Sequence, residues 1–270
     1  MNGNGATMDL GAANPQAFTQ WQPFEDKGIT HTVFRAGQGP GVLLMHELPG
    51  MTPEFWRLAN WLATRFTVFA PDLFGNDAKP TRPGLKRLFP KACISREIHL
   101  FSRNDPGPIT QWLRALARNL HEETGGPGVG VIGMCMTGNF ALTLALDPWV
   151  TAPVASQPGI PISLPLRPMH GGLQMNDEDR QALAQRDVDV MALRFEGDDF
   201  CPAARFATIR EVIGAERFKD HVLEDKHQNP ARKGKNPHSV LTADLVDADD
   251  SVTKQKLAEV IEFIEARIAG

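Results

Sequence analysis

The chain has 270 residues, 42% of them hydrophobic, so it can bury one large core, and α/β proteins of this size often form a single domain. A net charge of −4 and a pI near 6.1 give no general attraction for nucleic acid or an anionic membrane. Three cysteines, an odd number, argue against a disulfide framework and indicate a reducing, cytoplasmic compartment. The sequence before Lys27 also lacks the apolar segment of a secretory signal.

The predicted elements alternate between strands and helices. Residues 1–20 are rich in Gly, Asn and Ala and are expected to form a flexible tail, which leaves 21–270 as one domain. Residues 75–108 are rich in Pro, Arg and Lys and too long for a simple connection, so we expect a lid or pocket wall there. The alternation implies a mostly parallel central sheet with helices on both faces, an α/β class. Strands are predicted at 30–34, 41–45, 66–70, 128–133, 152–157, 188–195 and 218–223, and helices at 53–64, 109–123, 139–146, 177–186, 203–213 and 252–268.

A nucleophile motif lies where the strand at 128–133 meets the next helix. The run Gly133-Met-Cys135-Met-Thr-Gly138 corresponds to the G-x-S-x-G elbow of α/β-hydrolases, with sulfur in place of oxygen and Thr137 where the simple motif has Gly. Small neighbours are needed because the apex residue adopts a strained backbone angle. The helix N-terminus then directs free N–H groups toward developing negative charge. A buried structural cysteine is the alternative interpretation.

An acid and a histidine follow the cysteine in the order expected for α/β-hydrolases. Asp198 comes after the strand at 188–195, and His238 lies in a late polar loop, before a segment that could begin a helix. Asp199 competes with Asp198, which is favoured because it directly follows Gly197 at the strand's end. His238 competes with two other histidines, of which one lies in a predicted strand and one in a charged loop: His221 and His227.

Taken together, these segments resemble the dienelactone hydrolase family, α/β-hydrolases with a Cys-His-Asp triad, over about residues 28–268. The resemblance implies an α/β-hydrolase fold and the opening of an enol lactone that carries a carboxylate. It also implies that Glu47 contacts the cysteine and takes its proton, and that the N–H groups of Leu48 and Met136 form an oxyanion hole. The motifs that carry it are Gly133-x-Cys135-x-x-Gly138, Gly197-Asp198-x-x-Cys201-Pro202, His238-Ser239 and His46-Glu47-Leu48-Pro49-Gly50.

Recognition of a substrate carboxylate is expected to involve Ser239, which follows the triad histidine as in the family. Thr242 stands where the family pattern suggests an arginine, so Arg96 or Arg103 in the predicted lid would have to replace it. Both arginines have the alternative of a solvated surface charge. The expected partner is therefore an anionic small-molecule lactone or ester.

No metal or other cofactor is expected. His46-Glu47 begins like a zincin motif, but that motif needs a second His at position 50, which is Gly50. The cysteines at 93, 135 and 201 have no zinc-ligand spacing.

Thiol chemistry independently favours an activated acyl donor. A thiolate attacks carbonyls well, but it also leaves a tetrahedral intermediate more easily than an alkoxide does. Forward reaction therefore requires a leaving group about as acidic as a thiol, which enol lactones provide and peptides do not. Two alternatives stay open, a thiol-dependent esterase or acyltransferase, and an inactive α/β-hydrolase that serves as a binding protein.

Overall fold

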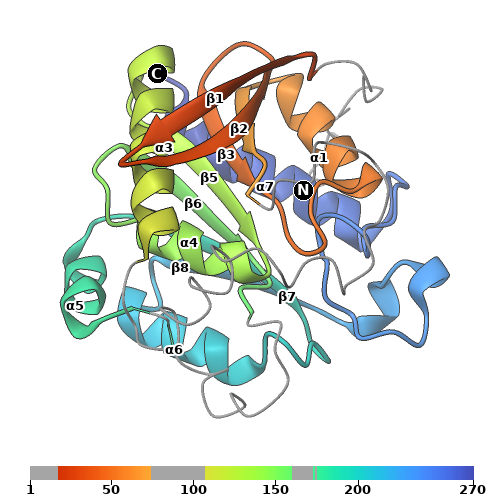
Figure 1. The fold of residues 1–270 in the computed structure, drawn as a ribbon. Helices are drawn as coiled ribbons and strands as arrows, with labels where there is room; N and C mark the ends of the chain where they lie inside the picture. The colour runs from red at the N-terminus through yellow and green to blue at the C-terminus, as the bar shows by residue number, and fades with distance from the viewer. Residues whose placement is uncertain (1–17, 74–106, 160–172, 174) are drawn as a thin grey trace, which may run out of the picture.

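A computed structural model describes residues 18–73, 107–159, 173 and 175–270 of the chain. Within these residues, eight strands form one sheet in the order β1-β2-β4-β3-β5-β6-β7-β8 (Figure 1). The pairs β1–β2 and β2–β4 are antiparallel, and every other neighbouring pair is parallel. The strands are β1 Gln20–Asp26, β2 Ile29–Ala36, β3 Gly41–Met45, β4 Thr67–Pro71, β5 Val129–Met134, β6 Val150–Ser156, β7 Val190–Phe195 and β8 Phe218–Leu223.

The central strands are buried along their whole length. All residues of β3, β4, β5 and β7 are buried, as expected for parallel strands covered on both faces. Their sequences are nearly continuous apolar runs, whereas β1 at the edge is mostly exposed. The carboxyl ends of the parallel strands all lie at the same end of the sheet, so the loops that follow these strands gather there. These loops carry the predicted catalytic residues.

Helices cover both faces of the sheet (Figure 1). On one face, α1 and α7 pack on the strands through a core that includes Leu58 and Ile261. On the other face lie α3, α4, α5 and α6, and Trp112 of α3 is fully buried there. The helices are α1 Pro53–Ala63, α3 Pro108–Thr124, α4 Met136–Leu144, α5 Asp177–Gln185, α6 Ala203–Ile213 and α7 Val252–Ile268, and two short 3-10 turns are η3 Asp225–His227 and η4 Pro230–Arg232.

The expected α/β class with a mostly parallel sheet is confirmed, and several predicted bounds match those observed. Strand β1 was not predicted, and because it begins at Gln20, folded structure starts before residue 21. Pro108, placed at the end of the predicted insertion, is the first residue of α3. The rest of that insertion up to 106, and residues 1–17 of the predicted tail, lie outside the described residues.

No helix in the described part of the chain combines the length and apolar character that crossing a membrane requires.

Candidate active site

Cys135 occupies a strained turn between β5 and α4. Its backbone has φ 56° and ψ −124°, a positive φ that non-glycine residues rarely adopt, as expected at the apex of a nucleophile elbow. The turn is too tight for side chains at its flanks. A Cβ on Gly133 would lie 2.1 Å from the Thr137 carbonyl oxygen, and one on Gly138 would lie 2.9 Å from Cα of Pro158. Both motif glycines are therefore required by close backbone contact.

Thr137, the departure from the family motif, stabilises the turn through its side chain. Its hydroxyl accepts a hydrogen bond from the Met134 N–H at 2.8 Å. The same oxygen lies 2.9 Å from the Met134 carbonyl and 3.2 Å from the His46 carbonyl, to either of which it can donate. The buried hydroxyl thus connects the elbow to the end of β3, a role that glycine could not perform.

Asp198 and His238 meet beside the elbow. Nδ1 of His238 lies 2.7 Å from Oδ2 of Asp198, and both residues are buried. The other carboxylate oxygen, Oδ1, accepts the N–H groups of Phe200 at 2.9 Å and Cys201 at 3.1 Å. Asp199, the competing acid, has an exposed side chain. Its N–H donates to Asn236. Asp198 is therefore the acid that orients His238.

The protonated form of His238 is stabilised by its neighbours. Burial opposes protonation, but the negative charges of Cys135 and Asp198 outweigh it and raise the pKa of His238 well above its usual value. Nε2 of His238 is buried and makes no hydrogen bond of ordinary geometry within the described residues. Since Nδ1 is occupied by Asp198, Nε2 is the nitrogen left for the thiol or a substrate. The competing histidines lie elsewhere, His221 in β8 beside Glu259 and His227 in η3.

The two backbone N–H groups predicted to form an oxyanion hole are those of Leu48 and Met136. Met136 is the first residue of α4, so its N–H has no partner within the helix. Leu48 follows β3, whose end pairs with the end of β5 through Met45 and Gly133. Within the described residues, no hydrogen bond engages the N–H of either residue. Both predicted donors therefore lie beyond the carboxyl ends of the parallel strands, as Cys135 does.

Glu47 is also buried beyond the carboxyl end of β3, and its hydrogen bonds are made with three polar side chains. Its carboxylate accepts hydrogen bonds from Ser239 at 3.0 Å, from Gln157 at 3.1 Å and from Thr242. Within the described residues, no hydrogen bond joins Glu47 to Cys135, and the contact that the family resemblance implies stays a prediction.

Other residues of this site were missed from the sequence. Asp244 accepts the N–H groups of His238 at 3.0 Å and Ser239 at 2.9 Å, and it is bound by Arg232. This carboxylate fixes the backbone on which the histidine stands and closes residues 240–244 into turns, where the sequence suggested the start of a helix. The contacts of Gln157 and Thr242 with Glu47 gave no sequence signal, because the two residues lie 110 and 195 positions from it.

The predicted carboxylate-binding residues are only partly described. Ser239 lies in the site, where its hydroxyl binds Glu47. Arg96 and Arg103 lie outside the described residues. Within the described residues, no group of three or more His, Cys, Asp or Glu side chains has an arrangement suited to a metal ion.

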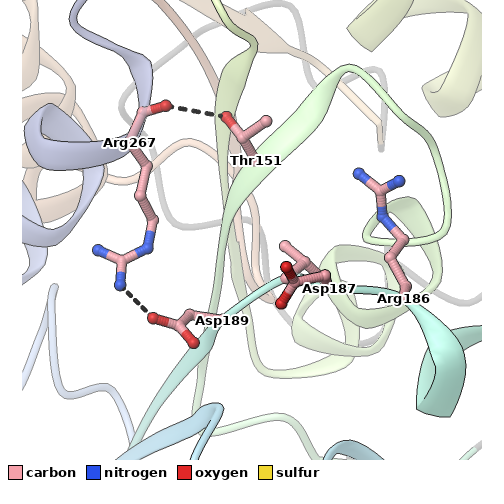
Figure 2. A pocket seen from close by; sticks show the side chains of 6 residues that line it. Thr151, Arg186, Asp187, Asp189 and Arg267 are labelled. Atoms are coloured by element: carbon pink, nitrogen blue, oxygen red, sulfur yellow. Dashed lines mark hydrogen bonds and ion pairs between the residues drawn. The ribbon is translucent and has the colours of Figure 1, made fainter.

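A separate pocket of about 280 Å³ lies at the opposite end of the strands, beside the starts of β6 and β7 (Figure 2). Thr151, Arg186, Asp187 and Arg267 are among its lining residues. Its charges serve the structure, because Arg267 pairs with Asp189 and Arg186 donates to the Val150 carbonyl at 3.0 Å. This pocket is not part of the site around Cys135.

The sheet order, the elbow and the Asp–His pair define an α/β-hydrolase. The chain belongs to the dienelactone hydrolase family, whose sequence model matches residues 29–224. A search of curated proteins finds no match.

Solved structures share the fold at low sequence identity. A Klebsiella pneumoniae protein assigned as a dienelactone hydrolase has a TM-score of 0.62 and 16% identity, covering 90% of this chain and 97% of its own. A dienelactone hydrolase-like promiscuous phosphotriesterase from metagenomic libraries has a TM-score of 0.59 and 15% identity, covering 93% and 98%. A cold-adapted esterase from an Arctic intertidal metagenomic library has a TM-score of 0.59 and 16% identity, covering 92% and 93%.

Proposed function

We propose that this hydrolase opens an enol lactone through a thioester on Cys135. The observation that carries the proposal is the position of Cys135 at the positive-φ apex of the elbow, beside a histidine that Asp198 holds at 2.7 Å. A buried structural cysteine would need neither the strained backbone nor the oriented histidine. The family of the chain supports the same reaction class.

The first half-reaction forms the thioester. The sulfur of Cys135, with its proton held by His238, attacks the carbonyl carbon, and the carbonyl oxygen becomes an oxyanion. The N–H groups of Leu48 and Met136 stabilise that oxyanion, each typically by about 3–4 kcal/mol. The intermediate collapses by breaking the ring C–O bond, and the departing enolate oxygen takes the proton from His238.

The second half-reaction releases the product. Neutral His238 accepts a proton from water as the water oxygen attacks the thioester carbon. The C–S bond then breaks, which restores the thiolate beside the protonated histidine. Asp198 orients the ring throughout and stabilises its charge. The family resemblance gave Glu47 the thiol proton, but here His238 is the neighbour of the thiol, so we assign the proton to His238.

The leaving group sets the substrate class. An enolate leaves about as readily as a thiolate, so the intermediate proceeds to the thioester. With a simple alkoxide, the thiolate is the better leaving group and the intermediate returns to the starting ester. We further propose that the substrate is anionic, with Ser239 and an arginine such as Arg96 or Arg103 near its carboxylate, and that the enzyme acts in the cytoplasm.

The deciding experiment compares hydrolysis of an enol lactone and of p-nitrophenyl acetate by the wild type and by Cys135→Ala. We expect lactone turnover in the wild type and a fall in kcat/KM of about 10⁴-fold or more in the variant, because removal of the nucleophile abolishes the covalent route. Cys201→Ala is the control, since it removes another buried thiol and leaves the Cys201 N–H to bind Asp198.

Each alternative gives a different result. Turnover of the nitrophenyl ester alone, still dependent on Cys135, would replace the lactonase with a thiol-dependent esterase or acyltransferase. Absence of Cys135-dependent turnover on either compound would contradict the proposal and favour a binding role.

A further inference from the structure

The end of β6 and the residues after it run beside the nucleophile elbow and bind the backbone of Cys135. The N–H of Cys135 donates to the Ser156 carbonyl at 3.1 Å, and the Cys135 carbonyl accepts the N–H of Gly159 at 3.1 Å. The same carbonyl also accepts the N–H of Gly138 at 3.0 Å. These hydrogen bonds hold the strained residue from inside and outside the elbow.

The hydrogen bonds to the Cys135 carbonyl also set the direction of the Met136 N–H, the predicted oxyanion donor. The carbonyl and this N–H belong to one trans peptide unit. Because a trans peptide is planar, its C=O and N–H groups point in opposite directions. A donor that binds the carbonyl therefore aims the N–H on the other side. Gly159 is such a donor, and it lies outside α4.

Gly159 is itself held by the side chain of Asn139. Nδ2 of Asn139 donates to the Gly159 carbonyl at 3.2 Å and to the Met136 carbonyl at 3.1 Å, and the side chain is buried. Gly159 also packs closely against the loop that contains Asp198, since a Cβ on it would lie 2.7 Å from the Phe200 carbonyl oxygen. One amide group thus connects the first turn of α4 to the segment that binds the nucleophile.

Arg205 of α6 determines which way the Asn139 amide points. Its Nη1 donates to Oδ1 of Asn139 at 3.0 Å, and Arg205 is fully buried. Burial lowers the pKa of Arg205 to about 10, which leaves the guanidinium charged at neutral pH. A guanidinium carries only donors, so the amide atom that faces it must be the oxygen. Nδ2 is then the atom that faces the two carbonyls.

Arg205 also belongs to the acid side of the site. Helix α6 begins directly after the loop that contains Asp198, and the Arg205 N–H donates to the Pro202 carbonyl at 2.9 Å. In the same loop, the Cys201 N–H donates to Asp198 at 3.1 Å. A chain of contacts therefore leads from the acid loop through Arg205 and Asn139 to the elbow.

We propose that Arg205 is a positioning residue, which acts through the Asn139 amide to aim the Met136 N–H at the oxyanion. The inference deepens the proposed function and rests on it for the role of that N–H. An arginine that only filled the core would stabilise the protein and affect every reaction of Cys135 alike. A positioning residue affects those reactions in which an oxyanion forms.

The test compares two reactions of Cys135, of which only one forms an oxyanion. Trifluoroacetone adds reversibly to a thiolate: the C–S bond forms, the carbonyl π electrons move to the oxygen, and the proton stays on His238. Iodoacetamide is attacked at its methylene carbon, iodide leaves, and no charge develops on a carbonyl oxygen. Fluorine NMR measures the dissociation constant of the adduct, and mass spectrometry of the Cys135 peptide measures the alkylation rate. Neither measurement needs turnover of a substrate.

Arg205→Met keeps the apolar stem and removes the guanidinium. We expect the adduct to bind about 10-fold or more weakly, because outright removal of an oxyanion donor reduces rates by about 10²–10³-fold. The alkylation rate should stay unchanged. Arg205→Lys keeps a donor and is expected to restore part of the affinity. Arg210→Met is the matched control, since it removes an exposed guanidinium paired with Asp220 on the same helix and should change neither reaction.

A double variant tests whether Arg205 acts through Asn139. Asn139→Ala is expected to weaken the adduct as Arg205→Met does, and the double variant is expected to weaken it no further than Asn139→Ala alone. The double variant leaves neither the buried charge nor its amide partner, a change that proteins tolerate better than the loss of one partner. Should Arg205→Met fail to fold, Asn139→Ala and the double variant must both weaken the adduct and spare alkylation.

The outcomes separate this inference from the proposed function. Equal losses in both reactions, additive losses in the double variant, an unchanged adduct in Arg205→Met, or no adduct on wild-type Cys135 would each overturn the inference. The expected adduct results together with no hydrolysis of an enol lactone would support the inference and contradict the lactonase activity alone.

Discussion

At the scale of single residues, His46 shows how a buried group becomes fixed in one protonation state. Its Nε2 accepts the Leu73 N–H at 3.1 Å, and its Nδ1 lies 3.2 Å from the Glu47 carbonyl oxygen. A proton on Nε2 of His46 would point at the Leu73 N–H, so that two donors would face each other with no acceptor between them. This geometry agrees with the lowering of the His46 pKa to about 4, of which burial is the main cause.

The lowered pKa of His46 predicts a loss of stability in acid. Between pH 6.5 and about 4 the unfolded chain binds a proton at this position and the folded chain does not, so stability is full above pH 6.5 and falls as the pH decreases. The resulting loss in the free energy of unfolding between pH 6.5 and about 4 amounts to about 3 kcal/mol. Urea unfolding of the wild type and His46→Gln at pH 7, 5.5 and 4.5 measures it.

The variant is expected to lose less stability than the wild type over this range. His238, whose raised pKa acts with the opposite sign, is present in both proteins and cancels in the comparison. Parallel curves for the two proteins would show that His46 is not the responsible group.

Residues with their own chemical signature could be assigned from the sequence, and their partners could not. Cys135, Asp198 and His238 were selected by motif and order, and the structure brings them together. Thr242 was noted only as a departure from the family, because a hydroxyl shows no preference for a carboxylate until folding brings the two together. Gln157 was assigned to a strand and no more.

At the scale of elements, the β5–α4 turn leaves no room for a side chain at Gly133. A Cβ on Gly133 would clash with the backbone of Thr137 at 2.1 Å, so Gly133→Ala must displace the first turn of α4. We expect a stability loss of about 1–3 kcal/mol. Because Cys135 and the Met136 N–H move with that turn, we also expect a fall of about 10²-fold in kcat.

Gly125→Ala is the control for this prediction. Gly125 has a positive φ, 67°, unlike Gly133, and nothing lies within 4 Å of a Cβ built there, so its substitution strains the backbone without a clash. Its substitution is expected to reduce stability and leave kcat unchanged. Equal kcat values for the two variants, measured at a temperature where both are folded, would contradict the role assigned to the turn.

Elements with strong patterns were predicted to within a few residues, and strand β1 at the antiparallel edge of the sheet was not. Helices α6 and α7 and strands β3 and β8 match their predicted bounds, and α7 begins at a Ser251 cap that binds the Lys254 N–H. Strand β1 reads Gln-Trp-Gln-Pro-Phe-Glu-Asp, which lacks a buried apolar face. Its pairing with β2 comes from backbone hydrogen bonds that no side-chain pattern records.

At the scale of the whole molecule, the contact between Ile264 of α7 and β5 lies near the opposite end of that strand from Cys135. Ile264 of α7 is fully buried against Gly130 near the start of β5, where a Cβ on the glycine would meet it at 2.8 Å. Cys135 follows the other end of that strand, five residues from Gly130 and so roughly 16 Å away. The helix that contains Ile264 also packs on the face opposite α4.

This separation predicts that a core defect beneath α7 weakens the protein without altering its chemistry. Ile264→Ala removes buried methyl groups and leaves a cavity, so we expect the free energy of unfolding to fall by about 2–5 kcal/mol. Ile264→Val, which removes one methylene, should cost about 0.5–1.5 kcal/mol. Urea unfolding measures the stability of both variants. The rate of Cys135 alkylation by iodoacetamide, measured as a function of pH, should match that of the wild type in each folded variant. A shift of that profile would mean that the packing of α7 reaches the site through β5, since Gly130 and Cys135 are joined by a single strand and its turn.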